Sequence, residues 1–201
     1  MSYIARRTDG GADAPLFLTF HGTGGSEDQF HGLAEQLLPG AHIVSPRGDV
    51  SEMGAPRYFR RTGEGVYDMA DLAQRTAAMT AFIEGEKART GASRVIGLGY
   101  SNGANILASV AFERPDLVDD MVLMHPLIPW QPPAQPGLAG RRVLITAGEQ
   151  DPICPAPMTK ALATYLTGQA ARVQTHWHPG GHEIRQDEVT AIQGFLATEN
   201  A

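Results

Sequence analysis

The sequence contains a single cysteine, and several features that define broad protein classes are absent from it. One thiol, Cys154, cannot form a disulfide within the chain, so the fold does not depend on an oxidising compartment. No apolar run approaches the roughly 18 to 20 residues that span a bilayer, so we expect no stable membrane insertion. Residues 1–7 lack the apolar stretch and small-residue cleavage site of a signal peptide, and we therefore expect a cytoplasmic protein.

The chain also lacks an excess of basic residues. It has 16 Lys and Arg against 22 Asp and Glu, which gives a formal net charge of −6. A nucleic-acid partner requires a basic face, so we expect none. The one local basic cluster, Arg57, Arg60 and Arg61, is typical of a solvated loop or of internal ion pairs.

What is present is a globular composition. Of the 201 residues, 42% are hydrophobic and 19% are charged, which suits one domain over residues 1–201 with a sizeable core. There is no internal repeat and no linker. The one biased stretch, residues 126–140, is rich in proline but too short to separate two domains.

Short apolar runs alternate with longer segments of helical periodicity. The runs predict strands at 16–20, 43–46, 94–100, 121–124, 143–147 and 173–177, and the last, which alternates, suits a sheet edge. The helical patterns cover 26–38, with Ser26 and Gln29 as a capping box, then 68–90, where Gly85 is a candidate break, 104–114, 158–166 and 188–196. This alternation predicts an α/β fold, a three-layer sandwich around a mostly parallel sheet.

A candidate nucleophile follows the third long apolar run. Residues 99–103 read Gly-Tyr-Ser-Asn-Gly and match the Gly-x-Ser-x-Gly pattern, with a predicted strand before it and a predicted helix after it. On such a turn the serine is strained and its hydroxyl exposed, and the flanking positions approach other backbone so closely that they must be small. The pattern in this context predicts Ser101 as the nucleophile of an α/β-hydrolase.

A glycine-rich loop after the first predicted strand is a candidate oxyanion hole. Residues 21–25 read His-Gly-Thr-Gly-Gly. In α/β-hydrolases one backbone N–H that binds the oxyanion follows the nucleophile, here Asn102, and another comes from such a loop, here Thr23. A phosphate-binding loop is the alternative, but neither Gly-x-Gly-x-x-Gly nor a Lys-Ser/Thr ending is present. We expect His21 to orient this loop.

The acid and the base follow the serine along the chain. Asp151 lies in the loop after the predicted strand at 143–147 and orients the base, with Glu149 as the rival carboxylate. His182 lies in the loop before the last helix, from which it can reach the nucleophile, and we predict it as the general base. His176 and His178 are alternatives on the last strand. The three histidines at 176, 178 and 182 also form a candidate zinc site for a metal-dependent hydrolase.

These motifs together resemble the phospholipase/carboxylesterase family of α/β-hydrolases, especially the bacterial branch linked to hydroquinone and quinone stress. The resemblance covers nearly the whole chain and rests on residues 20–25, 45–48, 57–61, 99–105, 148–152 and 181–182. It implies an α/β-hydrolase fold without a large lid domain. It also implies a carboxylesterase for short acyl esters, with thioesters and lysophospholipids as further candidate substrates, and a homodimer as a candidate state. The family often has Phe where this chain has Tyr58.

Two further expectations concern the substrate pocket and the alternatives to catalysis. Candidate pocket walls lie in segments near the predicted strand ends: Met53, Phe59, Leu127, Ile128, Trp130 and Ile153. Cys154 is expected to pack near Asp151, with a redox-sensitive thiol as the alternative. The serine mechanism requires no metal or organic cofactor. A small-molecule receptor on the same fold is the non-catalytic alternative.

Overall fold

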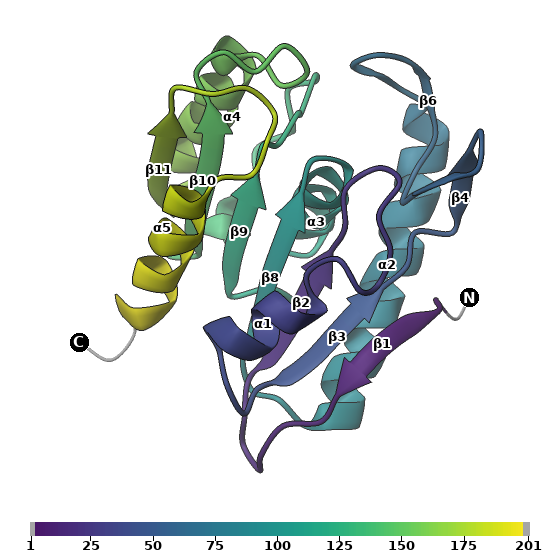
Figure 1. The fold of residues 1–201 in the computed structure, drawn as a ribbon, viewed down its shortest axis with the longest axis vertical. Coiled ribbons are helices and arrows are strands. Elements are labelled where there is room, and N and C mark those ends of the chain that lie inside the picture. The colour runs from purple at the N-terminus through teal and green to yellow at the C-terminus, as the bar shows by residue number, and fades with distance from the viewer. Residues whose placement is uncertain (1–2, 199–201) are drawn as a thin grey trace.

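The centre of the molecule is a seven-stranded sheet (Figure 1). The computed structural model describes residues 3–198. The strand order is β1-β3-β2-β8-β9-β10-β11, in which β1 is antiparallel to β3 and all other neighbours are parallel. The strands are β1 (Ala5–Thr8), β2 (Leu16–Phe20), β3 (His42–Pro46), β8 (Val95–Tyr100), β9 (Asp120–Met124), β10 (Arg142–Gly148) and β11 (Arg172–His178).

Helices cover both faces of this sheet. In Figure 1, α1 (His31–Leu37) and α5 (Gln186–Ala197) lie on the near face, and α2 (Met69–Thr90), α3 (Asn102–Glu113) and α4 (Ala156–Gly168) lie behind it. Two short hairpins, β4 (Val50–Glu52) with β5 (Ala55–Arg57) and β6 (Arg61–Gly63) with β7 (Val66–Tyr67), stand apart from the sheet, and a 3₁₀ turn covers Pro136–Leu138. The predicted three-layer α/β sandwich with a mostly parallel sheet is confirmed.

The central strands are buried on both faces, which explains their continuous apolar runs. In β2, Leu16 and Leu18 belong to the core beneath α2 to α4, whereas Phe17 belongs to the core beneath α1 and α5. All three side chains are fully buried. Because successive side chains of a strand point to opposite faces, a strand covered on both sides must be apolar at every position.

Six of the seven sheet strands lie where the apolar runs predict them, and β11 lies at a sheet edge as its alternating pattern indicates. Strand β1 and the two hairpins are additions that the apolar runs do not reveal, because these segments are short and largely exposed. Within residues 3–198, no helix combines the length and the apolar character that a membrane crossing requires.

The predicted capping box at Ser26 is wrong. Helix α1 begins at His31, and its N-cap residue, Phe30, makes no side-chain capping bond. The hydroxyl of Ser26 instead accepts from the backbone N–H of Asp28, which forms a local turn. The side chain of Gln29 reaches across the chain and accepts from the backbone N–H of Gly22, so this residue supports the glycine-rich loop rather than a helix.

Helix α2 runs without interruption through Gly85. The Asp68 side chain caps its first turn by accepting from Asp71, and the helix ends at Gly91, whose φ of 69° is a left-handed conformation. Between these two signals a single exposed glycine does not break the helix, because it lowers helix stability by only about 1 kcal/mol.

Candidate active site

Ser101 occupies a strained turn between β8 and α3. Its φ of 52° and ψ of −115° are rare for a residue with a side chain. Its backbone N–H donates to the carbonyl of Met124 (2.8 Å), and its carbonyl accepts from Asn105 (3.0 Å). The turn is held on both sides, so the hydroxyl is presented at the carboxyl edge of the sheet, where loops of parallel sheets form binding sites.

The structure brings Ser101, His182 and Asp151 into one line of hydrogen bonds. Ser101 Oγ lies 2.9 Å from His182 Nε2, and His182 Nδ1 lies 2.7 Å from Asp151 Oδ2. Since a carboxylate only accepts, Nδ1 carries the ring proton and Nε2 accepts from the serine hydroxyl. This is the arrangement in which an imidazole takes the proton of an attacking hydroxyl.

Asp151 is fixed by the loop that follows β10. Its Oδ1 accepts from the backbone N–H groups of Ile153 (2.8 Å) and Cys154 (2.9 Å). Burial raises the pKa of Asp151, but the bonds from Cys154, His182 and His125 outweigh burial and lower it below its ordinary value. Asp151 is therefore an ionised carboxylate. Glu149, the rival carboxylate, is exposed and makes no such contacts among the described residues.

The loop that bears His182 packs on Tyr100. The Tyr100 hydroxyl donates to the backbone carbonyl of His182 (2.6 Å), and the two rings are tilted against each other with centroids 5.2 Å apart. At the end of β10, Gly148 faces the backbone of Gly180 and Gly181 in this loop, where a β-carbon on Gly148 would collide with their carbonyl oxygens. The base is thus held by a hydrogen bond, a ring contact and a close backbone approach.

The glycine-rich loop after β2 is held by His21. Gly48 donates its backbone N–H to His21 Nε2 (2.9 Å), so the ring proton is on Nδ1, which donates to the carbonyl of Gly22 (2.7 Å). Thr23 follows, and its hydroxyl accepts from Arg57 (2.8 Å). The expected loop-orienting role of His21 thus has a direct geometric basis.

Thr23 and Asn102 border the same cavity as the Ser101 hydroxyl. Within residues 3–198 their backbone N–H groups donate to no protein acceptor. Asn102 is the first residue of α3, so its N–H also lies at the positive end of the helix dipole. Unpaired N–H groups beside a serine that borders a cavity are the donors that an oxyanion hole needs.

Tyr58, the residue that departs from the family pattern, contacts the first residue of the glycine-rich loop. Its fully buried hydroxyl accepts from the backbone N–H of His21 (3.1 Å) and donates to the carbonyl of Pro46 (2.8 Å). In this chain the extra hydroxyl therefore pairs two backbone groups at the ends of β2 and β3.

The cavity in front of Ser101 has a volume of about 330 Å³. Apolar atoms make up more than half of its surface, although most of the residues that form it have polar side chains: Thr23, Arg57, Arg61, Glu64, Gly65, Tyr67, Tyr100, Ser101, Asn102, Asn105, Leu127, Ile153, Cys154 and His182. Two of the predicted pocket residues, Leu127 and Ile153, belong to this wall.

The other four predicted pocket residues do not border this cavity. Met53 is fully exposed on the turn between β4 and β5. Phe59 is fully buried and packs in the core against Tyr67. Ile128 and Trp130 border a second cavity, between the proline-rich loop and α4. Proximity to a strand end in sequence does not determine which way a loop side chain points.

The basic cluster forms internal ion pairs, as one of the two expectations for it stated. Arg57 and Arg61 both pair with Glu52 (3.2 and 2.9 Å), and Arg61 also pairs with Glu64 (3.4 Å). Arg60 faces Asp71 at 3.9 Å. Because Arg57 and Arg61 in the cavity wall are paired with Glu52 and Glu64, the positive and negative charges around the cavity nearly cancel.

The three histidines of the proposed zinc site do not converge. His182 contacts Ser101 and Asp151, whereas His178 is buried beside Glu188. His176 lies near Asp187, 3.5 Å away, on the outer side. Among the described residues, the groups whose ligand atoms lie within 4.8 Å of one another do not include this set. The metal-dependent alternative built on it is therefore wrong, because the strand and the loop carry these rings in different directions.

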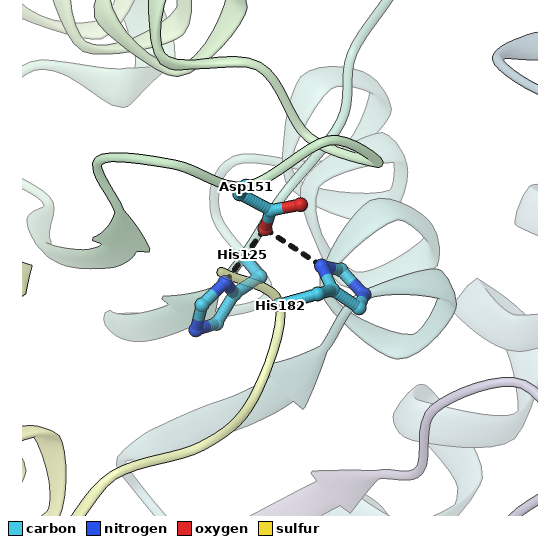
Figure 2. A group of neighbouring side chains, drawn as sticks. All are labelled: His125, Asp151 and His182. Carbon is cyan, nitrogen blue, oxygen red and sulfur yellow. Dashed lines mark hydrogen bonds and ion pairs between the residues drawn. The ribbon is translucent and has the colours of Figure 1, made fainter. Parts of the chain in front are cut away.

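Sequence reasoning missed two buried residues behind the site, His125 and Glu188. His125 directly follows β9, and its ring lies 2.9 Å from Asp151 Oδ2 (Figure 2). Glu188 lies in the first turn of α5 and contacts the far side of that ring at 3.1 Å. The available signal was the position of His125 at the carboxyl end of a predicted strand.

Cys154 lies in the cavity wall but is buried, and burial raises the pKa of its thiol well above the ordinary value. Its Sγ contacts the carbonyl of His125 at 3.1 Å. A thiol in this state is a poor nucleophile and is slow to oxidise. The packing role expected for Cys154 agrees with these contacts.

Several known proteins are similar to this chain in sequence and in fold. The model of the dienelactone hydrolase family matches residues 55–190. MhqD of Bacillus subtilis (strain 168), which carries the name of a hydrolase, is 40% identical over 181 residues, or 89% of this chain and 90% of MhqD. The protein Atu2452 of unknown function from Agrobacterium tumefaciens str. C58 is 58% identical, with a TM-score of 0.92 over 98% of this chain and 96% of that one. A carboxylesterase of Bacillus cereus is 36% identical, with a TM-score of 0.89 over 97% and 94%.

The fold and these relatives define an α/β-hydrolase of carboxylesterase type. More narrowly, the chain belongs to the dienelactone hydrolase family. The matching model thus carries a different family name from the one the motifs suggested, and the resemblance to hydrolases and carboxylesterases is confirmed.

Proposed function

We propose that the protein is a serine carboxylesterase with Ser101 as nucleophile, His182 as general base and Asp151 as the carboxylate that orients the base. The observation that carries this proposal is the continuous line of hydrogen bonds from Asp151 through His182 to a strained, cavity-facing serine. Cys154, the one other nucleophilic candidate in the cavity wall, is held as a buried thiol.

The reaction proceeds through an acyl-enzyme. Ser101 Oγ attacks the ester carbonyl while His182 Nε2 accepts the hydroxyl proton. The backbone N–H groups of Thr23 and Asn102 bind the oxyanion, and His182 then gives the proton to the leaving alcohol. Water enters with His182 again as base, releases the carboxylic acid and restores the serine. No step requires a metal or an organic cofactor.

The substrates that fit are small-molecule esters with short acyl chains. A cavity of about 330 Å³ is near the lower end of the roughly 300–1,000 Å³ of small-molecule sites. Arg57, Asn105 and Tyr67 make much of its wall polar, which is a poor surface for a long alkyl chain. Short thioesters fit by the same argument, and lysophospholipids with long chains fit less well.

A series of p-nitrophenyl esters tests this size limit. We expect kcat/KM for the acetate or butyrate to exceed that for the octanoate by roughly tenfold or more, because each misplaced methylene loses about 1 kcal/mol or more of binding. The same rates in EDTA show whether a metal takes part, and we expect them to be unchanged. Equal rates along the series contradict the size limit, and loss of activity in EDTA contradicts the mechanism. Tight binding of esters without any turnover favours the receptor alternative.

A further inference from the structure

The side chain of His125 lies directly behind the proposed triad and is completely buried. It follows β9, and its φ of 48° lies in the left-handed region that disfavours residues with a β-carbon. Such strain costs of order 1 kcal/mol or more and persists where surrounding contacts hold the residue in place. The backbone bond from His125 to the carbonyl of Thr146 (2.8 Å) is one of those contacts.

Both ring nitrogens of His125 face carboxylates. Nδ1 lies 2.9 Å from Asp151 Oδ2, the oxygen that also accepts from His182, as Figure 2 shows. Nε2 lies 3.1 Å from Glu188 Oε1. The two imidazoles therefore converge on one oxygen of Asp151, and a second carboxylate holds the far side of the buried ring.

The other partners of both carboxylates are donors. Asp151 Oδ1 accepts from the two backbone N–H groups of its own loop. Glu188 Oε1 accepts from the hydroxyl of Thr146 (2.6 Å), and Oε2 accepts from the backbone N–H of Arg185 (2.7 Å). Donors that surround a carboxylate favour its ionised form, and an ionised carboxylate only accepts. Each ring nitrogen of His125 then supplies the proton of its own bond.

His178, the other buried histidine of this cluster, does not bridge the two carboxylates. Gly180 donates its backbone N–H to His178 Nδ1 (3.1 Å), so the ring proton of His178 is on Nε2. That nitrogen lies 3.4 Å from Glu188 Oε2 and 3.5 Å from His125 Nε2. His178 thus directs its Nε2 at Glu188 and has no contact with Asp151, so His125 is the ring that bridges the two carboxylates.

We propose that His125 is a buried imidazolium that acts as a positioning residue, bridging Asp151 and Glu188, holding the Asp151 carboxylate toward His182 and offsetting part of its negative charge. The effect on catalysis rests on the function proposed above, whereas the charge of His125 does not. Without a cation between them, the two buried carboxylates would repel each other and would have only uncharged donors to replace their hydration, and the imidazolium supplies the opposite charge.

The ionisation of the neighbouring groups agrees with this assignment. Burial lowers the pKa of His125, but the hydrogen bonds to Glu188 and Asp151 outweigh burial and raise it above its ordinary value. Burial likewise raises the pKa of Glu188, but the bonds from His125 and Thr146 outweigh burial and lower it. The other titratable groups that face His125 are Tyr100, Cys154, His178 and His182. Burial raises the pKa of Tyr100 to about 12 and also raises the pKa of the Cys154 thiol, so neither of these two carries a charge.

The imidazolium has a predictable effect on the pH profile. The ring centroids of His125 and His182 are 5.2 Å apart, so a positive charge on His125 disfavours a second one on His182. Removal of His125 lets His182 keep its proton to higher pH, and a protonated His182 cannot act as base. The acid limb of kcat/KM is therefore expected to move to higher pH by about one to two units, the size of a charge–charge interaction at this separation with an effective dielectric constant of roughly 20–40.

The charge itself is measured by NMR of the ¹⁵N-labelled wild-type protein, with the His125 signals assigned through His125→Asn. Asparagine suits the variant because it tolerates a left-handed backbone. We expect two ring N–H protons on His125 at pH 7.5, where an ordinary histidine is about 90% neutral. A single proton on the ring at that pH overturns the proposal. So does a stoichiometric metal in the purified protein that His125→Asn removes.

The positioning effect is measured on kcat/KM from pH 5 to 9 in the wild type and in His125→Asn. His176→Asn is the matched control, since His176 lies outside the cluster beside Asp187, and its acid limb is expected to stay in place. An unmoved limb in a folded His125→Asn overturns the positioning role. A wild type without esterase turnover refutes the proposed function instead, and the NMR result still decides the charge of His125.

Discussion

Replacement of Ser101 by alanine is expected to lower kcat for p-nitrophenyl butyrate by about 10⁵-fold or more. The hydroxyl is the atom that forms the acyl-enzyme, and no neighbouring nucleophile can replace it, because the Cys154 thiol is buried and protonated. In serine hydrolases the triad acts as a unit, so loss of the nucleophile alone removes nearly all of its contribution. Stopped-time assays with high enzyme concentration measure the residual rate.

Ser109→Ala is the matched control for this variant. Ser109 lies on the same helix, α3, is buried, and donates only to the carbonyl of Asn105 (2.8 Å). Its loss is expected to cost about 1 kcal/mol of stability and to leave kcat within a factor of about three. A Ser101→Ala variant that folds like the wild type and keeps a tenth of its activity contradicts the assignment of the nucleophile.

Replacement of Gly103 by alanine is expected to impair both activity and stability. A β-carbon at this position would collide with the carbonyl oxygens of Phe20 and His21 and would lie 2.6 Å from the Phe20 carbonyl carbon. Since these are backbone atoms of β2 and of the glycine-rich loop at residues 21–25, they cannot move aside without displacing that loop. We expect kcat/KM to fall by about 100-fold or more and the free energy of unfolding to fall by about 1–3 kcal/mol or more.

Gly85→Ala provides the comparison for this second prediction. Gly85 lies within α2 and is exposed, and a β-carbon added there would meet no atom within 4 Å outside its own helical turns. The same chemical change at Gly85 is expected to raise the free energy of unfolding by about 0.5–1 kcal/mol and to leave kcat/KM unchanged. Urea unfolding and ester kinetics on both variants measure the effects. If Gly103→Ala and Gly85→Ala change the free energy of unfolding and kcat/KM equally, the close approach of Gly103 to the backbone of Phe20 and His21 is contradicted.

The sequence predicts the sheet and the triad for the same physical reason. Strands buried on both faces must be apolar throughout, so the sequence shows β2, β8, β9 and β10 as continuous runs of apolar residues. The carboxyl ends of those strands then determine where Ser101 and Asp151 lie. The order Ser, Asp, His along the chain supplies the base. These features depend on local pattern and on fold topology, both of which a sequence contains.

The features that sequence analysis missed depend on the direction of individual side chains. His125 follows a predicted strand, but nothing local indicates that its ring turns inward between Asp151 and Glu188, which are 26 and 63 residues away. Met53 and Phe59 both lie in loops near the site, and one is fully exposed while the other is fully buried. Gln29 fits the pattern of a helix cap, although its side chain serves the distant Gly22.

The central claim is that Ser101 is the nucleophile, and the most direct test is to locate the adduct of a fluorophosphonate probe. After reaction of the wild-type protein, peptide mass spectrometry is expected to find one adduct per chain, on Ser101. Ser101→Ala is expected to show none, and esterase activity is expected to disappear in step with labelling. An adduct on another residue, or full esterase activity in a wild type that the probe does not label, would contradict the assignment of Ser101.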